Sequence, residues 1–316
     1  MKKTIGIIGF GNMGSAIAEG IKDKYQVFVF DKDKDKTKNL SGIKISVSLA
    51  DLANKVDTII LAVKPQDFRD VLKEMKPTRA KARGTQGRNT KAALISALKG
   101  GDCERRSIKG AIKDKLIISI AAGIPTRYIE ECLGTVRVIR VMPNLPAVIG
   151  EGMSCICKGE YAKEKDLEFT EKLFKNLGKT LVVKEIMMNA VTAISGSGPG
   201  YYYYLIEDDP KQYKSNRNLF KKQFISYLTA AAEDVGFSHP KARFLSIGTG
   251  NACDSLLEKS GLPPEELKKR VASKGGTTEA GLKVLKHNIR NLPKAVKAAL
   301  RRAKELSKRH QLKLKP

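Results

Sequence analysis

Short apolar runs rich in isoleucine and valine alternate with segments of helical period over the first part of the chain. Runs of this kind, bounded by glycine, aspartate or proline, are typical of buried strands. We expect such strands at residues 4–9, 25–30, 58–63 and 116–121. A glycine turn after the first of them leads into a helix expected over residues 12–21. Strands separated by helical segments predict a parallel sheet with crossover helices.

The same alternation continues to about residue 184 and then stops. The further elements that we expect before this point are strands at residues 137–141 and 152–157, a helix at 164–177 and a strand at 180–184. Beyond it Ala, Leu, Glu and Lys dominate, which indicates helices, the last of them basic and placed near residues 294–309. The pattern therefore predicts an α/β fold of two domains, residues 1–184 with the sheet and residues 185–316 all helical.

Two polar, basic stretches interrupt this organisation, at about residues 78–113 and 208–224. Both are expected to be surface insertions, one in each domain. The chain carries 59 Lys and Arg against 33 Asp and Glu, a formal net charge of +26. Because the basic residues are spread over most of the chain, a solvated surface that attracts polyanions weakly is favoured over a specific nucleic-acid or membrane partner.

Five cysteines are present, Cys103, Cys132, Cys155, Cys157 and Cys253, and none forms a CxxC pair. This pattern predicts neither a disulfide framework nor a metal site, and it favours a reducing, cytoplasmic location. No apolar run approaches the roughly 20 residues of a membrane helix. The opening MKKTIGIIGF has the basic start of a signal peptide, but glycines interrupt its apolar run, so a strand and a turn explain it better.

A GxGxxG sequence, GFGNMG, lies between the first predicted strand and the first predicted helix. Gly9 permits the tight turn, Gly11 lets the backbone approach a pyrophosphate, and Gly14 lets the helix pack closely. The helix N-terminus adds backbone amides and a positive dipole. A purely structural glycine turn is the alternative, but the position between strand and helix favours a dinucleotide-binding turn.

Asp31 ends the second predicted strand, about 20 residues after the glycines. A carboxylate there accepts hydrogen bonds from the adenosine ribose and repels the extra phosphate of NADPH, so Asp31 favours NADH. Neighbouring Lys32 and Lys34 weaken this discrimination, and a capping aspartate is the alternative. Lys64 follows the third strand, where it either reaches a cofactor or an acidic substrate or merely precedes the proline that ends the strand.

Two glycine-rich turns precede helices in the second half, SGSGP at residues 195–199 and SKGGTT at residues 273–278. Amides and hydroxyls at such turns bind carboxylates, which suits a small anionic substrate, although simple helix caps are the alternative. His239, His287 and His310 belong to no Ser-His-Asp arrangement or metal-ligand spacing, so neither histidine base catalysis nor a metal is predicted.

The segments GFGNMG, AVKPQ, ISIAAGI, RVIRVMPNLP, SGSGPGY and SKGGTTEAGL occur in the order found in pyrroline-5-carboxylate reductases. The chain resembles this family over nearly its whole length outside the two insertions. The resemblance implies a Rossmann domain followed by a helical dimerisation domain, and hence a homodimer or a dimer-based oligomer. It also implies reduction of 1-pyrroline-5-carboxylate to L-proline, the final step of proline biosynthesis, with NADPH or NADH. A protonated cyclic imine accepts hydride readily, so the protein chiefly has to align donor and acceptor.

The resemblance and the patterns above together give a set of candidate site residues. The cofactor-binding residues are Ile8, Gly9, Phe10, Gly11, Asn12, Met13, Gly14, Asp31, Ala62, Val63, Lys64, Pro65, Ile120, Ala121, Ala122 and Asn144. The substrate-binding residues are Ser195, Gly196, Ser197, Gly198, Gly275, Gly276, Thr277 and Thr278. Thr278 matches the threonine that hydrogen-bonds the ring nitrogen in the family, which makes it the candidate catalytic residue.

The chain departs from the family pattern in places. Lys274 stands where the family usually has proline, so the SKGGTT loop is expected to be less rigid. The stretch 78–113 is expected to be tolerated as a surface loop at modest entropic cost, whereas 208–224 interrupts the helix after SGSGPGY and is expected to impair assembly or activity.

Three other interpretations stay open. A related imine or hydroxyacid reductase is one, although the lysine expected of hydroxyacid enzymes on the long helix is missing from SGSGPGYYYY. The others are a reductase inactivated by its insertions and a basic NAD-binding protein that associates with nucleic acid, which lacks a recognised nucleic-acid motif.

Overall fold

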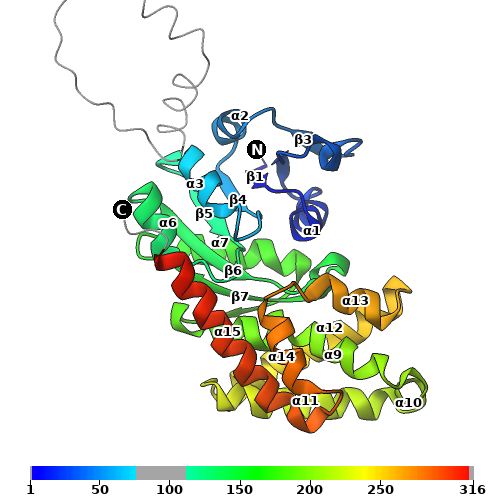
Figure 1. The fold of residues 1–316 in the computed structure, drawn as a ribbon. Helices are drawn as coiled ribbons and strands as arrows, with labels where there is room; N and C mark the ends of the chain where they lie inside the picture. The colour runs from blue at the N-terminus through cyan, green and yellow to red at the C-terminus, as the bar shows by residue number, and fades with distance from the viewer. Residues whose placement is uncertain (1, 76–111, 313–316) are drawn as a thin grey trace, which may run out of the picture.

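The computed structural model describes residues 2–75 and 112–312 (Figure 1). The stretch expected as an insertion at 78–113 lies almost wholly outside these residues, as does Cys103. Within them, eight strands form one sheet in the order β3-β2-β1-β4-β5-β6-β7-β8. Their bounds are β1 Thr4–Ile8, β2 Gln26–Phe30, β3 Ile43–Ile45, β4 Thr58–Leu61, β5 Leu116–Ser119, β6 Arg137–Met142, β7 Gly152–Lys158 and β8 Gly178–Val182.

Every strand expected from the apolar runs is present. β3 is an additional strand, and its three residues are too few to show a pattern in the sequence. The sheet is not purely parallel, because β6 and β7 are antiparallel, with Arg140 opposite Cys157. The expected parallel sheet is confirmed for the other strand pairs, and this pair is the exception. Only the 3₁₀ helix η2 (Leu145–Ile149) and a few further residues connect the two strands, whereas parallel neighbours need a crossover of about a dozen residues or more.

Helices cover both faces of this sheet. The helices among the described residues of this half of the chain are α1 Asn12–Ile21, α2 Leu49–Lys55, α3 Phe68–Met75, α6 Thr126–Leu133 and α7 Glu164–Phe174, with short turns η1 Lys34–Thr37 and η3 Lys175–Leu177. α1 and α7 pack on the face that carries Ile5 and Ile7, while α2, α3 and α6 pack on the face that carries Ile59 and Leu61. Side chains alternate between the two faces of a strand, and both faces are buried, which explains the continuous apolar runs.

The second half is helical throughout, as expected. Its elements are η4 Glu185–Met187, α8 Met188–Val191, η5 Thr192–Gly196, α9 Gly198–Glu207, α10 Pro210–Ser215, α11 Arg217–Asp234, α12 His239–Ser260, α13 Pro264–Val271, α14 Thr277–Leu285, η6 Ile289–Asn291 and α15 Leu292–Leu312. Met153 and Cys155 of β7 belong to the same core as these helices, so the sheet and the helical half pack directly together. In Figure 1, α15 runs from the side of α11 towards α6. No helix in the described part of the chain is long and apolar enough to cross a membrane.

The polar stretch 208–224 is more than a surface insertion. It interrupts the helix after SGSGPGY, since α9 ends at Glu207, and it then forms α10 and the start of α11. Tyr213 and Phe224 from this stretch are buried in the helical core. The stretch therefore contributes to packing, and its effect on assembly or activity stays a prediction.

Asp254 of α12 binds several side chains of this stretch. Its carboxylate accepts hydrogen bonds from Tyr213 (2.7 Å), from Arg217 Nε (2.9 Å) and from Lys221 Nζ (3.0 Å). Burial on its own would raise the pKa of this carboxyl, but the hydrogen bonds outweigh burial and lower the pKa of Asp254 to about 2. The carboxylate is thus ionised in the folded chain and ties α10 and α11 to α12.

Candidate active site

The GFGNMG turn has the geometry of a dinucleotide-binding turn. Gly9 has φ +97, in the left-handed region that favours glycine, and α1 begins three residues later at Asn12. A Cβ on Gly14 would lie 2.1 Å from the Gly9 carbonyl oxygen, so this residue has to be glycine for α1 to approach β1. A Cβ on Gly11 would meet no atom within 4 Å. The open side of Gly11 at the helix N-terminus is where a pyrophosphate fits.

Asp31 lies beside this turn and binds it. Its Oδ2 accepts a hydrogen bond from the Phe10 amide at 2.7 Å, and its Oδ1 accepts one from the Asp33 amide at 2.9 Å. Lys36 Nζ approaches Oδ1 to 3.7 Å. The carboxylate therefore holds the glycine turn in place, a role that its position after the strand did not reveal.

A cavity of about 560 Å³ opens in front of the glycine turn. Seven of the predicted cofactor residues line it, namely Ile8, Gly9, Gly11, Asp31, Ala62, Val63 and Lys64. Lys32 and Lys36 line the same cavity, as do the acidic side chains of Asp67 and Glu74. The wall of this cavity thus carries both signs of charge.

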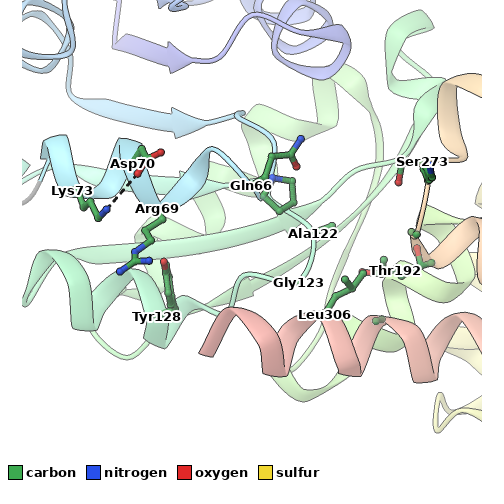
Figure 2. A pocket seen from close by; sticks show the side chains of 16 residues that line it. Gln66, Arg69, Asp70, Lys73, Ala122, Gly123, Tyr128, Thr192, Ser273 and Leu306 are labelled. Atoms are coloured by element: carbon green, nitrogen blue, oxygen red, sulfur yellow. Dashed lines mark hydrogen bonds and ion pairs between the residues drawn. The ribbon is translucent and has the colours of Figure 1, made fainter. Parts of the chain in front are cut away.

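A second cavity of about 620 Å³ lies beside the first, and Gln66 and Asp70 line both. Segments from both halves of the chain form its wall (Figure 2). They are Pro65 and Gln66 after β4, Arg69, Asp70 and Lys73 of α3, Ala122 and Gly123 after β5, Tyr128 of α6, Thr192 of η5, Ser273 to Thr277, and Ala303 and Leu306 of α15. This position, at the carboxyl ends of β4 and β5, is where open α/β sheets bind ligands.

The SGSGP and SKGGTT turns meet at this second cavity. Thr278 Oγ1 donates a hydrogen bond to Ser197 Oγ at 3.1 Å, and Ser197 Oγ also shares a hydrogen bond with Thr277 Oγ1 at 3.1 Å. Thr277 lines the cavity, whereas Ser197 and Thr278 are buried behind it. Thr192 to Gly196 form a π-helical turn, closed by a 2.8 Å hydrogen bond from the Ser197 amide to the Thr192 carbonyl. π-helical turns are rare in proteins, and those that occur often lie at functional sites.

Several predicted residues do not appear on the cavity walls. The cofactor candidates of this kind are Phe10, Asn12, Met13, Gly14, Ile120, Ala121 and Asn144, and the substrate candidates are Ser195, Gly196, Ser197, Gly198 and Thr278. Asn144 is 3% exposed, and its Oδ1 accepts a hydrogen bond from the Met153 amide at 2.8 Å, which fixes β7. Its Nδ2 has no hydrogen-bond partner among the described residues. A cofactor role for Asn144 stays a prediction.

Two predicted cofactor contacts, Pro65 and Ala122, lie on the second cavity and not on the first. Sequence reasoning missed Gln66, although it belongs to the AVKPQ segment and follows directly after Pro65. It also missed Arg69 and Thr192, which lie outside every glycine-rich turn and gave no local signal. Tertiary packing alone brings these side chains to the cavity.

Comparison with known proteins agrees with this geometry. Residues 4–84 match the family described as NADP oxidoreductase coenzyme F420-dependent, and residues 220–308 match pyrroline-5-carboxylate reductase dimerisation. The pyrroline-5-carboxylate reductase of Pisum sativum is 31% identical to this chain over 314 residues, which cover 96% of each protein. The chain belongs to the pyrroline-5-carboxylate reductase family.

Solved structures of this family have the same fold. The Plasmodium falciparum pyrroline carboxylate reductase with NADP bound is 27% identical, with a TM-score of 0.55 over 97% of this chain and 98% of that one. The Coxiella burnetii pyrroline-5-carboxylate reductase is 26% identical, with a TM-score of 0.58 over 97% and 99% of the two chains. The resemblance expected from the motifs, the Rossmann and helical fold class, and the assignment as an oxidoreductase are therefore confirmed.

Proposed function

We propose that this chain reduces 1-pyrroline-5-carboxylate to L-proline with a nicotinamide cofactor. The observation that carries the proposal is the pair of adjacent cavities, one in front of the GFGNMG turn and one at the SKGGTT loop, with Gln66 and Asp70 on both walls. Such an arrangement would allow a dinucleotide and a small substrate to bind next to each other. Membership of the reductase family supports the choice of substrate.

The residues present fit a nicotinamide dinucleotide, because Gly11 leaves space at the start of α1 and Gly9 and Gly14 permit the tight turn. A bound reduced cofactor would supply hydride to the imine carbon, so that the C=N bond becomes a single bond and the nitrogen keeps its proton. The glycine turn would hold the pyrophosphate. The SKGGTT loop would hold the substrate carboxylate, with Thr277 directed to the cavity and Thr278 joined to it through Ser197.

Both cofactors fit this chemistry, and the site has features that favour each. Asp31 on the cavity wall favours NADH, because its charge repels a phosphate on the ribose. Lys32 and Lys36 on the same wall attract such a phosphate. The NADP named for a family relative supports NADPH as well. We propose that the enzyme accepts both, with Asp31 shifting the balance towards NADH.

The enzyme is further proposed to be a homodimer or a dimer-based oligomer in the cytoplasm. The match of residues 220–308 to a dimerisation family supports the assembly. Light scattering after gel filtration of the full chain measures the mass of the particle. A particle with the 34.7 kDa mass of one chain would contradict the proposal.

Turnover tests the function directly. Purified protein is mixed with NADH or NADPH and 1-pyrroline-5-carboxylate, and the loss of reduced cofactor is followed by absorbance. Unsubstituted 1-pyrroline serves as the second substrate, because it has the imine but not the carboxylate. We expect turnover on the carboxylate and much less on 1-pyrroline. Equal turnover on both would indicate an imine reductase of different specificity, and cofactor binding without turnover on either would contradict the proposed function.

A further inference from the structure

The SKGGTT loop, residues 273–278, joins α13 to α14 and lines the second cavity. The Gly276 amide donates a hydrogen bond to the Ser273 carbonyl at 2.9 Å, which closes a tight turn. Gly275 inside this turn has φ +70, in the left-handed region. Many conformations are open to a glycine in the absence of restraints, so an unsupported loop of this kind is costly to order.

Two side chains hold both backbone polar groups of Gly275. Arg302 Nε of α15 donates a hydrogen bond to the Gly275 carbonyl at 2.8 Å, and the Gly275 amide donates one to Glu279 Oε2 of α14. Arg302 Nη1 in turn binds Glu305 Oε2 at 2.9 Å, which orients the guanidinium. Both contacts to Gly275 involve a charged group, and hydrogen bonds of this kind are about twice as strong as neutral ones.

Besides the Gly276–Ser273 hydrogen bond, these two contacts are the restraints on the Gly275 backbone found among the described residues. Lys274, before Gly275, does not restrict its own backbone in the way that proline would. The Lys274 amide donates none of the backbone hydrogen bonds found in the described part of the loop. A proline at position 274 would therefore remove no hydrogen bond there, and it would restrict the loop before ligand binds.

We propose that Arg302 is a positioning residue, which together with Glu279 holds Gly275 so that residues 275–277 keep the shape of the substrate cavity wall. Arg302 does not line the cavity itself and acts through the Gly275 carbonyl. The C-terminal helix α15 thereby controls substrate binding by the loop, independently of the cofactor turn. The effect on KM rests on the proposed function, whereas the effect of Arg302 on the order of the loop does not.

The test compares Arg302→Met with Arg301→Met in the full chain. Both changes remove one positive charge from α15, but Arg301 is an exposed neighbour on the same helix. Hydrogen exchange of the peptide that spans residues 273–278 reports the clamp without reference to activity. For Arg302→Met we expect this exchange to be about tenfold faster, and KM for 1-pyrroline-5-carboxylate to rise about tenfold, with kcat changed by less than about threefold. The cofactor affinity of Arg302→Met is expected to equal that of the unmodified chain. Arg301→Met is expected to keep the unmodified values of loop exchange and KM.

Rescue separates a positioning role from a general loss of structure. Lys274→Pro added to Arg302→Met is expected to lower KM and to slow loop exchange again, because the proline restores part of the restraint. If Arg302→Met fails to fold, Glu279→Gln, which weakens the other half of the clamp, is measured in the same way. Loop exchange and KM equal to those of the unmodified chain, or a matching change in Arg301→Met, would overturn the proposal. Unmodified protein without turnover would contradict the proposed function alone, since hydrogen exchange would still decide the clamp.

Discussion

Thr278 Oγ1 lies 3.1 Å from Ser197 Oγ and donates a hydrogen bond to it, which joins two glycine-rich turns that are 81 residues apart. Ser197 also bonds Thr277, whose side chain lines the second cavity. Thr278 is only 4% exposed, so it lies behind Thr277 and not on the cavity surface. In this arrangement the hydroxyl of Thr278 fixes Ser197 and Thr277 relative to the second cavity.

Replacement of Thr278 by alanine is expected to lower turnover while leaving NADH affinity nearly intact. Loss of one buried hydrogen bond of about 1 kcal/mol corresponds to a decrease of about fivefold. The measurement is kcat at saturating imine, with cofactor affinity from nicotinamide fluorescence. Thr278→Ser keeps the hydroxyl and is the matched control. If Thr278→Ala turned over the pyrroline at the unmodified rate, Thr278 would have no part in the mechanism.

Asp31→Ser is expected to improve the use of NADPH relative to NADH, by about tenfold in the ratio of kcat/KM values, because a charge next to the ribose is removed. The structure adds a second effect. Asp31 accepts a hydrogen bond from the Phe10 amide of the glycine turn, so affinity for both cofactors is expected to fall. Asp33→Ser, which removes an exposed carboxylate from the same loop, is the control. An unchanged cofactor ratio would count against the assignment of Asp31.

The fold could be predicted from the sequence wherever an element carries its own local signal. The strand at residues 58–61 begins at Thr58 and continues into an apolar run, and it lies where the pattern placed it. The three-residue strand β3 is too short for any period to be visible. The direction of β7 depends on the length of its connection to β6 and on pairing with it, and neither appears in the alternation of apolar and polar residues.

The site could be predicted only in part for a related reason. The glycines of GFGNMG are recognisable in the sequence, because Gly9 and Gly14 meet local steric requirements and Gly11 completes the motif between them. The contact of Arg302 on α15 with Gly275 in the loop before α14 joins residues 27 positions apart, and no local pattern marks either as a partner. Asp31 was found by its position, but its hydrogen bond to Phe10 depends on the three-dimensional approach of two turns.

The glycines of the cofactor turn are expected to respond differently to alanine. Gly14→Ala places a Cβ 2.1 Å from the Gly9 carbonyl, so α1 has to shift, and we expect a loss of stability of about 2 kcal/mol. Gly11→Ala meets no neighbouring atom, so stability is expected to stay within about 0.5 kcal/mol while cofactor affinity falls about tenfold or more. Denaturant unfolding and cofactor titration of both variants measure the two effects. Normal cofactor binding by Gly11→Ala would indicate that the pyrophosphate does not lie against this turn.

The Asp254 cluster predicts how stability depends on acid. The folded-state pKa of Asp254 is lowered from its ordinary value of 3.8 to about 2. A lowered pKa stabilises the folded chain at pH above the ordinary value, and this contribution is lost as pH falls from about 4 to about 2. The shift corresponds to roughly 2 kcal/mol. Urea unfolding of the unmodified chain is therefore expected to show this loss across that pH range.

Asp254→Asn provides the direct comparison. At neutral pH this variant leaves Arg217 and Lys221 without their buried partner, and we expect it to be destabilised by about 3 kcal/mol. Its stability should change less with pH between about 4 and about 2, because the titrating carboxyl is gone. Glu258→Gln, which removes only an exposed partner of Arg217, is the control and should leave the free energy of unfolding nearly unchanged. Equal acid sensitivity of Asp254→Asn and the unmodified chain would show that other carboxyl groups cause the acid unfolding.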